Sequence, residues 1–536
     1  MANTTTDADV VVIGSGVLGA LAAYELAKAG KSVLIIEAGP RIQRWQIVEA
    51  WRNSLNKTLS ASPYPNPPHA PNPFGDYLVQ KGPIPFGTNY VRAVGGTTWH
   101  WTAAAWRLIP NDFKLKSVYG KGRDWPISYE DLEPFYARAE AEMGVNGNGD
   151  EDQSGRSDKP FPHRSTPYPM EGQQYNYMQG RVATRLLAGG VTSMHEPNAR
   201  ATRAYDDRPP CAGNNTCTPI CPIGAKYQGD NHIEKAERLG AKVLENSVVY
   251  NIEVGTDGKI AAVHYRRPDK TEARVTGKYF ILAAHGIEAP KLLLMSTSPA
   301  YPRGVANSSD QVGRNLMDHT GISMVLTVKE AMWPGDGPPQ LLVMMQGRDG
   351  AFRKDTAAYK HKIRNATNNL GLAGDLIKAG VMGSKLDKQL KFNLSHQLGF
   401  ATDFEVLPNP NNRIVLSKEK FDALGLPVPE IHYDVDDYWN NGRDAAIKDY
   451  HRFAELLGGE ITTLDVGHQN REHLMGTTIM GADPKDSVVD GNCRSHDHAN
   501  LFIIGTGVMP AVGCVNPTLT GAALSLRMAE VLKKEV

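Results

Sequence analysis

The sequence predicts an α/β fold of two domains, and three features of the chain indicate it. A β-branched run, a glycine-rich turn and a helix-forming stretch follow one another within residues 8–39. The composition changes near Gly321, where strands, turns and an irregular Gly-, Met- and Lys-rich middle begin. Glycine-rich sequence returns near His468 and ends in a helical stretch. We therefore expect three segments, a first domain in 1–320, a second domain in 321–465, and a return to the first domain in 466–536.

The N-terminal unit has the pattern of a Rossmann-like fold. Residues 10–13 are apolar and mostly β-branched, which is typical of a buried strand. Gly14, Gly16 and Gly19 follow as G-x-G-x-x-G. In that motif the glycines allow a tight turn, the close approach of a pyrophosphate and the packing of the next helix on the strand. Residues 20–29 are good helix formers, and a glycine stops the helix.

An acidic residue completes the unit. Residues 32–36 form the second expected strand, and Glu37 ends it. A carboxylate about 20 residues after the glycines accepts hydrogen bonds from a ribose 2′-hydroxyl and would repel a 2′-phosphate. The unit therefore predicts an adenine dinucleotide site, although the motif alone does not separate FAD from NAD. The alternative is a glycine-rich turn in some other α/β unit.

The remaining elements follow from local signals. Eight prolines in residues 41–92 argue against a regular helix or central strand there and indicate a wrapping segment. Ser128 and Asp131 form a capping pattern that begins a helix. Residues 144–170 are expected to be loop. Further helices are expected at 124–142, 173–189, 284–296, 436–457 and 520–533, and strands at 242–254, 259–266, 279–283, 392–404 and 413–417.

Composition excludes several classes of protein. The 536 residues have a formal net charge of zero, which argues against a nucleic-acid binder. No apolar run is long enough to span a membrane. The first residues have neither a basic region nor an apolar one, so we expect a cytosolic protein or one exported with a partner. Five cysteines, three of them within eleven residues, do not resemble a disulfide framework.

Several motifs together identify a family resemblance. They are the N-terminal unit, Gly-Gly-Thr-Thr-Trp-His-Trp at 95–101, segments 284–296 and 312–319, His-Leu-Met-Gly-Thr at 473–477, and the stretch 505–526. In this order they resemble the glucose–methanol–choline (GMC) oxidoreductases, a family of FAD enzymes. The likeness is greatest to the catalytic subunits of bacterial FAD-dependent glucose dehydrogenases, and it includes the cysteine cluster. Ala289 departs from the Ser or Thr usual in the family, so a hydroxyl contact is expected to be lost there.

The resemblance implies the fold and the cofactor. A discontinuous Rossmann-like FAD-binding domain is expected, with a loop inserted near 205–228, beside an α+β substrate domain with an antiparallel sheet. His100 fits the position through which some relatives tether FAD, and otherwise it contacts the cofactor or packs in the core. The residues expected to bind FAD are Gly14, Gly16, Gly19, Glu37, Gly95, Gly96, Thr97, His100, Val249, Gly505, Asn516, Pro517 and Thr518.

The resemblance also implies the catalytic pair. Alcohol oxidation needs a proton acceptor at the hydroxyl, and a histidine with a near-neutral pKa suits that role. His473 matches the family's His-x-x-Gly-Thr motif, and Asn516 matches the second catalytic position, which the family fills with His or Asn. Nearby His468 is the competing candidate, but it lacks the Gly-Thr that follows.

The three clustered cysteines indicate a redox centre. Cys211, Cys217 and Cys221 read as Cys-x5-Cys-x3-Cys-Pro, whose ending resembles a ferredoxin motif. Three thiolates without a nearby fourth suit a [3Fe–4S] cluster. Zinc fits less well because a structural zinc site uses four ligands. A disulfide with one free thiol is the other alternative.

The expected activity follows from the same resemblance. It is the oxidation of the anomeric hydroxyl of glucose to the lactone, with electrons passing from FAD through the cluster to a multihaem cytochrome c subunit. A small helper subunit would carry the export signal, so the complex would lie on the periplasmic face of the inner membrane. The alternatives are a dehydrogenase of sorbitol, fructose or gluconate, an oxygen-using oxidase, and a non-catalytic flavin–iron–sulfur relay.

Overall fold

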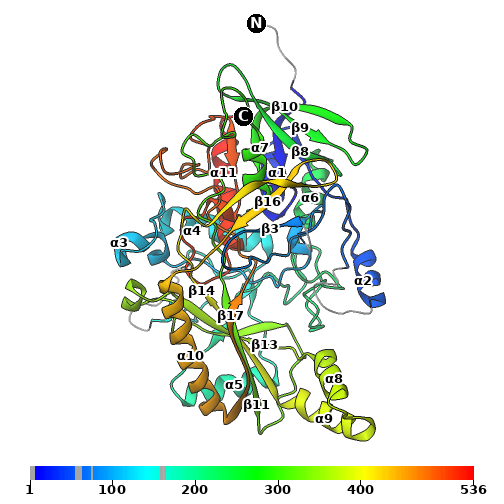
Figure 1. Cartoon of the computed structure of the whole chain (residues 1–536), viewed down its shortest axis with the longest axis vertical. Helices are drawn as coiled ribbons and strands as arrows, with labels where there is room; N and C mark the ends of the chain where they lie inside the picture. The colour runs from blue at the N-terminus through cyan, green and yellow to red at the C-terminus, as the bar shows by residue number, and fades with distance from the viewer. Residues whose placement is uncertain (1–5, 55–62, 74–76, 157–160, 162–163) are drawn as a thin grey trace.

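The computed structural model describes residues 6–54, 63–73, 77–156, 161 and 164–536. In Figure 1 the chain forms two bodies stacked along its longest axis. The body that holds both termini contains a mainly parallel sheet, and the other contains an antiparallel sheet covered by the long helix α10 (Asp437–Leu457). The α/β class and the antiparallel second sheet are as the sequence predicts.

The first sheet is built around β1 (Ala8–Ile13). It pairs in parallel with β2 (Val33–Ile36) on one side and with β10 (Glu272–Leu282) on the other. β7 (Lys242–Leu244) extends the sheet beyond β2, and β18 (Leu501–Ile503) pairs in parallel with β10. Strands from the N-terminal, middle and C-terminal parts of the chain thus share one sheet, which confirms a discontinuous domain.

Antiparallel strands and helices complete this body. β10 pairs with β9 (Ile260–Arg266), which pairs with β8 (Val248–Val254). The helix α1 (Val17–Lys28) follows the glycine loop and packs against α11 (Thr518–Leu532), where the Ser525 hydroxyl donates to the Leu18 carbonyl at 2.7 Å. The other helices here are α4 (Tyr129–Met143), which has the expected Ser128–Asp131 capping box, α6 (Gly229–Arg238) and α7 (Glu288–Met295).

The second sheet is antiparallel throughout. Its strand order is β17, β11, β14, β13, β12 and β6. Their bounds are Gly459–Gln469, Gly321–Val328, Gln397–Phe404, Tyr359–Arg364, Gln340–Met344 and Met194–His195. Helix α10 buries Trp439, Tyr450 and Phe453. The edge strand β6 comes from the segment expected to belong to the first domain, so the chain crosses between the bodies more often than the sequence indicates.

A small third sheet ties the wrapping segment to the first body. β15 (Arg413–Phe421) pairs with β16 (Pro427–His432), which pairs in parallel with β3 (Val79–Gln80). The remaining short elements are α3 (Leu115–Tyr119), α5 (Tyr177–Ala188), α8 (Asn369–Lys378), β4 (Asn146–Gly147), β5 (Met170–Glu171) and the 3₁₀ turns Gly96–Trp99, Pro110–Phe113, Ala351–Lys354 and Thr506–Val508.

Three expectations are wrong in detail. The segment 41–92 contains a helix, α2 (Arg44–Asn53), because its first 22 residues contain no proline. The strand expected at 392–404 begins only at residue 397, because α9 (Gly383–His396) occupies the residues before it. In addition, the strand expected at 242–254 is interrupted between β7 and β8. Residues 55–62 and 74–76 of the wrapping segment lie outside the described residues.

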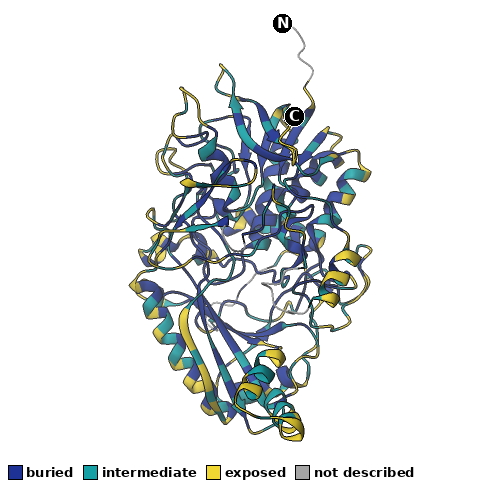
Figure 2. Cartoon of the chain, turned by 45° about the vertical axis from the view of Figure 1, so that its right-hand side comes forward, coloured by how far each residue is buried: buried dark blue, intermediate teal, exposed yellow. Residues whose placement is uncertain are grey.

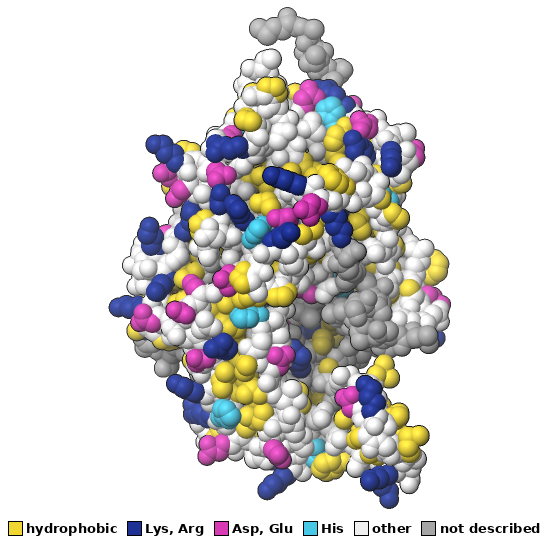
Figure 3. Space-filling model, viewed as in Figure 1, with side chains coloured by type: hydrophobic (Ala, Val, Ile, Leu, Met, Phe, Trp, Pro, Cys, Tyr) yellow, Lys and Arg dark blue, Asp and Glu magenta, His cyan; other side chains and the backbone are white. Residues whose placement is uncertain are grey.

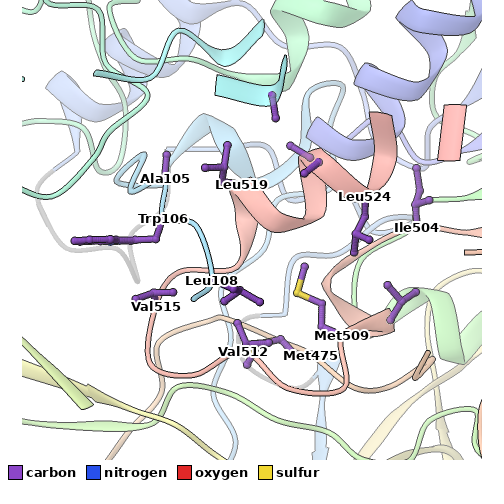
Figure 4. Packing of buried hydrophobic residues seen from close by; sticks show 14 of the residues in the cluster. Ala105, Trp106, Leu108, Met475, Ile504, Met509, Val512, Val515, Leu519 and Leu524 are labelled. Carbon is purple, nitrogen blue, oxygen red and sulfur yellow. The ribbon is translucent and has the colours of Figure 1, made fainter. Parts of the chain in front are cut away.

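The core joins the C-terminal segment to the first body. Buried residues, dark blue in Figure 2, continue from the parallel sheet toward the junction of the two bodies. There Trp106 and Leu108 lie close to Val512 and Val515, on the loop before α11 (Figure 4). The loop is therefore held by core packing. On the face in Figure 3, Lys and Arg are interspersed with Asp and Glu.

We predict that Gly19→Ala destabilises the protein and lowers its FAD content, because an added Cβ would lie 2.1 Å from the Gly14 carbonyl oxygen. The expected cost is about 1–3 kcal/mol. Gly180→Ala is the matched control, since Gly180 also lies within a helix but an added Cβ meets nothing within 4 Å. It should stabilise the protein by about 0.5–1 kcal/mol. Chemical denaturation and flavin absorbance measure both effects, and equal stability of the two variants would contradict the close packing.

Candidate active site

One cavity connects the N-terminal glycine loop to the predicted catalytic pair. It runs between the parallel sheet and the loops that carry His473 and Asn516. Two residues expected to bind FAD, Gly19 and Gly95, do not line it. The predicted residues that line the cavity are Gly14, Gly16, Glu37, Gly96, Thr97, His100, Val249, His473, Gly505, Asn516, Pro517 and Thr518.

The glycine loop fits a dinucleotide. A Cβ added to Gly16 would meet nothing within 4 Å, so its backbone is open on the cavity side. A Cβ on Gly96 would lie 2.9 Å from the Gly16 Cα, so the two glycine turns touch. Gly95 has a positive φ of 93° and begins the second turn. The two turns leave exposed backbone where a pyrophosphate would lie.

Glu37 is held ready to accept hydrogen bonds. Its carboxylate accepts the backbone N–H of Ser15 at 3.0 Å, the Ser15 hydroxyl at 2.7 Å and the backbone N–H of Gly39 at 3.0 Å. Burial raises the pKa of this carboxyl, and these donors oppose the shift. A carboxylate has room for further donors, so Glu37 fits a ribose diol.

His100 faces the same cavity and is uncharged. Burial, with a smaller contribution from Lys226, lowers its pKa to about 3. Its ring lies 5.8 Å from that of Tyr64, and its carbonyl accepts the hydroxyl of Thr218 at 2.9 Å. A cofactor contact fits this position, and covalent attachment of the flavin there stays a prediction.

The predicted catalytic pair is in direct contact. His473 follows β17, and Asn516 precedes α11, yet the amide Nδ2 of Asn516 lies 2.8 Å from the Nε2 of His473. Asp318 fixes the turn before His473, because its carboxylate accepts the backbone N–H groups of His473 and Arg471 at 2.8 Å each. His468 does not line the cavity and stacks on Trp439, with ring centroids 4.2 Å apart.

A second histidine supports the first. The Nδ1 atoms of His319 and His473 lie 3.0 Å apart, and the Nε2 of His319 donates to the carbonyl of Gly513 at 2.8 Å. In the sequence, the segment 312–319 is recognised as one of the family motifs, and no role in the site is predicted for His319. The adjacent acid and histidine at its end, Asp318 and His319, were the available signal for a role in the site.

Both histidines are uncharged in this environment. Burial lowers the pKa of His473 well below its usual value, and nearby His319 lowers it further. Burial lowers the pKa of His319 to about 3. A neutral His473 keeps one ring nitrogen without a proton, so it can accept a proton from a substrate hydroxyl that takes the place of the present hydrogen-bond donor at that nitrogen.

A buried charged cluster lies beside the pair, and the sequence offered no signal for it. The Asp403 carboxylate contacts the ammonium groups of Lys360 at 3.1 Å and Lys362 at 2.9 Å, and the guanidinium of Arg471 at 2.8 Å. Burial alone would raise the pKa of Asp403, but these cations hold it well below its usual value. Lys360 also donates to the Oδ1 of Asn516 at 2.8 Å.

The three clustered cysteines are not brought together as a ready metal site. Among the described residues no group of three or more His, Cys, Asp or Glu side chains converges to hold a metal ion. Cys217 and Cys221 are buried, Cys211 is partly exposed, and all three are free thiols. Cationic groups surround the buried pair, since Arg200 donates to the Sγ of Cys217 at 3.5 Å, and Arg44 and Lys226 donate to carbonyls of the same loop. Three free thiols with positive groups around them have the chemistry that an anionic iron–sulfur cluster requires. Their present arrangement does not fit one, because the three side chains do not converge.

Comparison with known proteins defines the class. A model of FAD dependent oxidoreductases matches residues 9–53, and models of GMC oxidoreductases match residues 178–321 and 408–525. With the dinucleotide cavity and its histidine, these matches define an FAD-dependent oxidoreductase. The chain is 44% identical to the fructose dehydrogenase large subunit of Gluconobacter japonicus, over 100% of this chain and 99% of that protein. The chain therefore belongs to the GMC oxidoreductase family, whose members act on CH–OH groups.

More distant proteins share the whole length of the chain. The 2-methyl-1,2-propanediol dehydrogenase of Mycolicibacterium austroafricanum is 28% identical over 100% of this chain and 96% of that protein. A formate oxidase variant of Aspergillus oryzae has a similar fold, with a TM-score of 0.69 over 99% of both chains at 14% identity. Within the described part of the chain, every helix is too short or too polar to cross a membrane.

We predict that the protein loses stability as the pH falls from about 6.5 towards 3, and that His319 contributes to this loss. The folded state holds the pKa of His319 at about 3, whereas the unfolded chain takes up a proton first. His319→Gln should therefore reduce the slope of the free energy of unfolding against pH by up to about 1.4 kcal/mol per pH unit. His451→Gln, at an exposed histidine of α10, is the control. Denaturation curves between pH 7 and 5 measure the slopes, and the same slope in wild type and His319→Gln would contradict the burial of a neutral ring.

Proposed function

We propose that the protein is an FAD-dependent dehydrogenase that oxidises a hydroxyl group of a sugar. The observation that carries this proposal is the contact of His473 with Asn516 in the cavity that the dinucleotide loop also lines. The family resemblance favours glucose, oxidised at its anomeric hydroxyl to the lactone. The full-length likeness to a fructose dehydrogenase large subunit favours fructose as the second candidate.

The residues divide the chemistry between them. The Nε2 of His473 takes the proton of the substrate hydroxyl, and the amide of Asn516 donates a hydrogen bond to the same oxygen. Bound FAD supplies the hydride acceptor. Asn516 is buried and His473 is partly buried, which limits the access of bulk water to the proton acceptor.

Anaerobic mixing with a panel of sugars tests this proposal. Glucose, fructose, sorbitol and gluconate are each added to the purified flavoprotein, and bleaching of the flavin is recorded. Rapid bleaching by one of them supports a dehydrogenase and identifies its substrate. No bleaching by any of them would favour the non-catalytic relay, and rapid peroxide formation in air would favour an oxidase.

We predict that His473→Ala retains FAD but reduces flavin by the best sugar at least about 10²-fold more slowly, the usual contribution of a general base. Asn516→Ala should show a smaller loss, because it removes a hydrogen bond and leaves the base. Stopped-flow measurement of flavin reduction gives both rates. A nearly normal rate in His473→Ala would remove this histidine from the mechanism.

For the exit of electrons we propose a [3Fe–4S] cluster bound by Cys211, Cys217 and Cys221. Thr218, next to Cys217, lines the cofactor cavity, whereas Cys211 lines an open groove at the surface. A centre in this loop would thus lie between the flavin and a docking partner. The resemblance implies that this partner is a cytochrome c subunit at the periplasmic face of the inner membrane, with a small helper subunit. Binding the cluster requires the loop to bring Cys211 to the other two thiols.

We predict that Cys217→Ser abolishes the electron paramagnetic resonance signal of the cluster and transfer to the cytochrome, while sugar still bleaches the flavin. Cys493→Ser is the matched control, since Cys493 is also a buried free thiol but lies outside the cluster loop. Iron analysis of the purified complex accompanies both measurements. Normal cytochrome reduction by Cys217→Ser would show that the cysteines are structural.

A further inference from the structure

The mechanism above leaves one buried charge beside the reaction centre unused. Lys360 lies in β13 and is wholly buried. Its ammonium donates to the Oδ1 of Asn516 at 2.8 Å and pairs with the Asp403 carboxylate at 3.1 Å. In the antiparallel sheet Lys360 stands directly opposite Asp403. Lys360 itself does not line the cofactor cavity.

This contact determines the orientation of the Asn516 amide. An ammonium group can only donate hydrogen bonds, so the atom of Asn516 that faces Lys360 is the carbonyl oxygen. The NH₂ group then faces the Nε2 of His473, 2.8 Å away. In the flipped amide, the NH₂ group would face the ammonium of Lys360, donor against donor, and both groups would be buried without that hydrogen bond.

The orientation of the amide in turn determines the tautomer of His473. Because Nδ2 of Asn516 donates, the Nε2 of His473 accepts and carries no proton. The ring proton of neutral His473 is then on Nδ1, where it is donated to the Nδ1 of His319 at 3.0 Å. His319 therefore carries its own proton on Nε2, which donates to the carbonyl of Gly513 at 2.8 Å. Each group in this series of hydrogen bonds thus has one compatible arrangement of donors and acceptors, and Lys360 determines that of Asn516, the first in the series.

We propose that Lys360 is a positioning residue that, through Asn516, holds the proton-free Nε2 of His473 toward the substrate hydroxyl. This inference rests on the proposed function, since it concerns the same base. Lys360 acts on the reaction in a second way as well. Its positive charge lies one side chain away from the substrate oxygen, where negative charge develops as His473 takes the proton.

Lys362 provides a matched control. It lies two residues along the same strand and pairs with the same Asp403 carboxylate, at 2.9 Å. Its only hydrogen bond from the ammonium is to that carboxylate, within the described part of the chain. Lys360→Met and Lys362→Met thus each remove one cation from Asp403, but only the first releases the amide of Asn516.

A double-mutant cycle tests the proposal. Flavin reduction by the best sugar is measured for Lys360→Met, Lys362→Met and Asn516→Ala, and for each lysine variant combined with Asn516→Ala. Lys360→Met should slow reduction by about 10- to 100-fold, and by less than about 3-fold when Asn516 is already Ala. The effect of Lys362→Met should be the same in both backgrounds. An equal loss from Lys360→Met in both backgrounds would overturn the proposal, because Lys360 would then not act through Asn516.

The pH profile gives a second readout that a purely structural role would not change. The charged or titratable groups that act most on the pKa of His473 are His319, Asp403, Lys360 and Lys362. The Asp318 carboxylate also accepts the backbone N–H of His473. Removing the positive charge of Lys360 raises the pKa of His473, so the acid limb of flavin reduction should move to higher pH in Lys360→Met. Lys360→Arg, which keeps the charge and the donors, should restore most of the rate and the wild-type profile. An unchanged profile in Lys360→Met would contradict the proposal.

Histidine tautomers can also be observed without turnover. In the holoenzyme labelled with ¹⁵N-histidine, the nitrogen shifts of His473 should report protonated Nδ1 in the wild type and a mixture of tautomers in Lys360→Met. If the wild type shows this tautomer but no sugar bleaches its flavin, the proposed function fails and the positioning role stands. If sugars bleach the flavin but the tautomer is unchanged in Lys360→Met, the positioning role fails alone.

Discussion

The buried carboxylate of Asp403 is the interaction on which the site depends. Three cations converge on it, two from strand β13 and one from the loop after β17, and an unpaired cation in this interior would cost several kcal/mol. Arg471 is the member that matters most for geometry. Its guanidinium also donates to the carbonyls of Ile322 and Thr402, so it ties the turn before His473 to two adjacent strands of the antiparallel sheet. The carboxylate of Asp318 also holds this turn, because it accepts the backbone N–H of His473.

This arrangement explains why the chain is assembled from discontinuous segments. The proposed base, His473, comes from the turn after β17, its partner Asn516 from the loop before α11, and the charged support from β13 and β14. The first body provides the cavity for the cofactor, and the second provides the buried charges. Neither body alone contains the proposed site, and the loop that carries Asn516 is held by the packing of Val515 beside Trp106 in the core of the first body (Figure 4).

The sequence predicts the parts of this protein that depend on local signals. The strand, glycine turn and acid of residues 8–39, and the capping box before α4, rely on neighbours in sequence and were predicted in type and place. The pairing of Lys360 with Asp403 could not be predicted in this way. The two residues are neighbours only because of the register between β13 and β14, which the folded sheet defines. The strand expected at 392–404 fails for a similar reason, since the apolar residues at its start belong to the exposed helix α9.

The excess of positive charge at the site favours the proposed reaction and does not favour the stability of the fold. Lys360, Lys362 and Arg471 carry three positive charges, against the single negative charge of Asp403. A fold selected only for stability would pair these charges or replace them with apolar side chains. Burial is the main cause of the lowered pKa of His473, and Lys360 and Lys362 add to it by opposing protonation of the ring. The excess of positive charge also favours negative charge on a substrate oxygen that loses its proton. Under the proposed mechanism, the same cluster helps to keep His473 neutral before the reaction and stabilises the negative charge left when the substrate loses its proton.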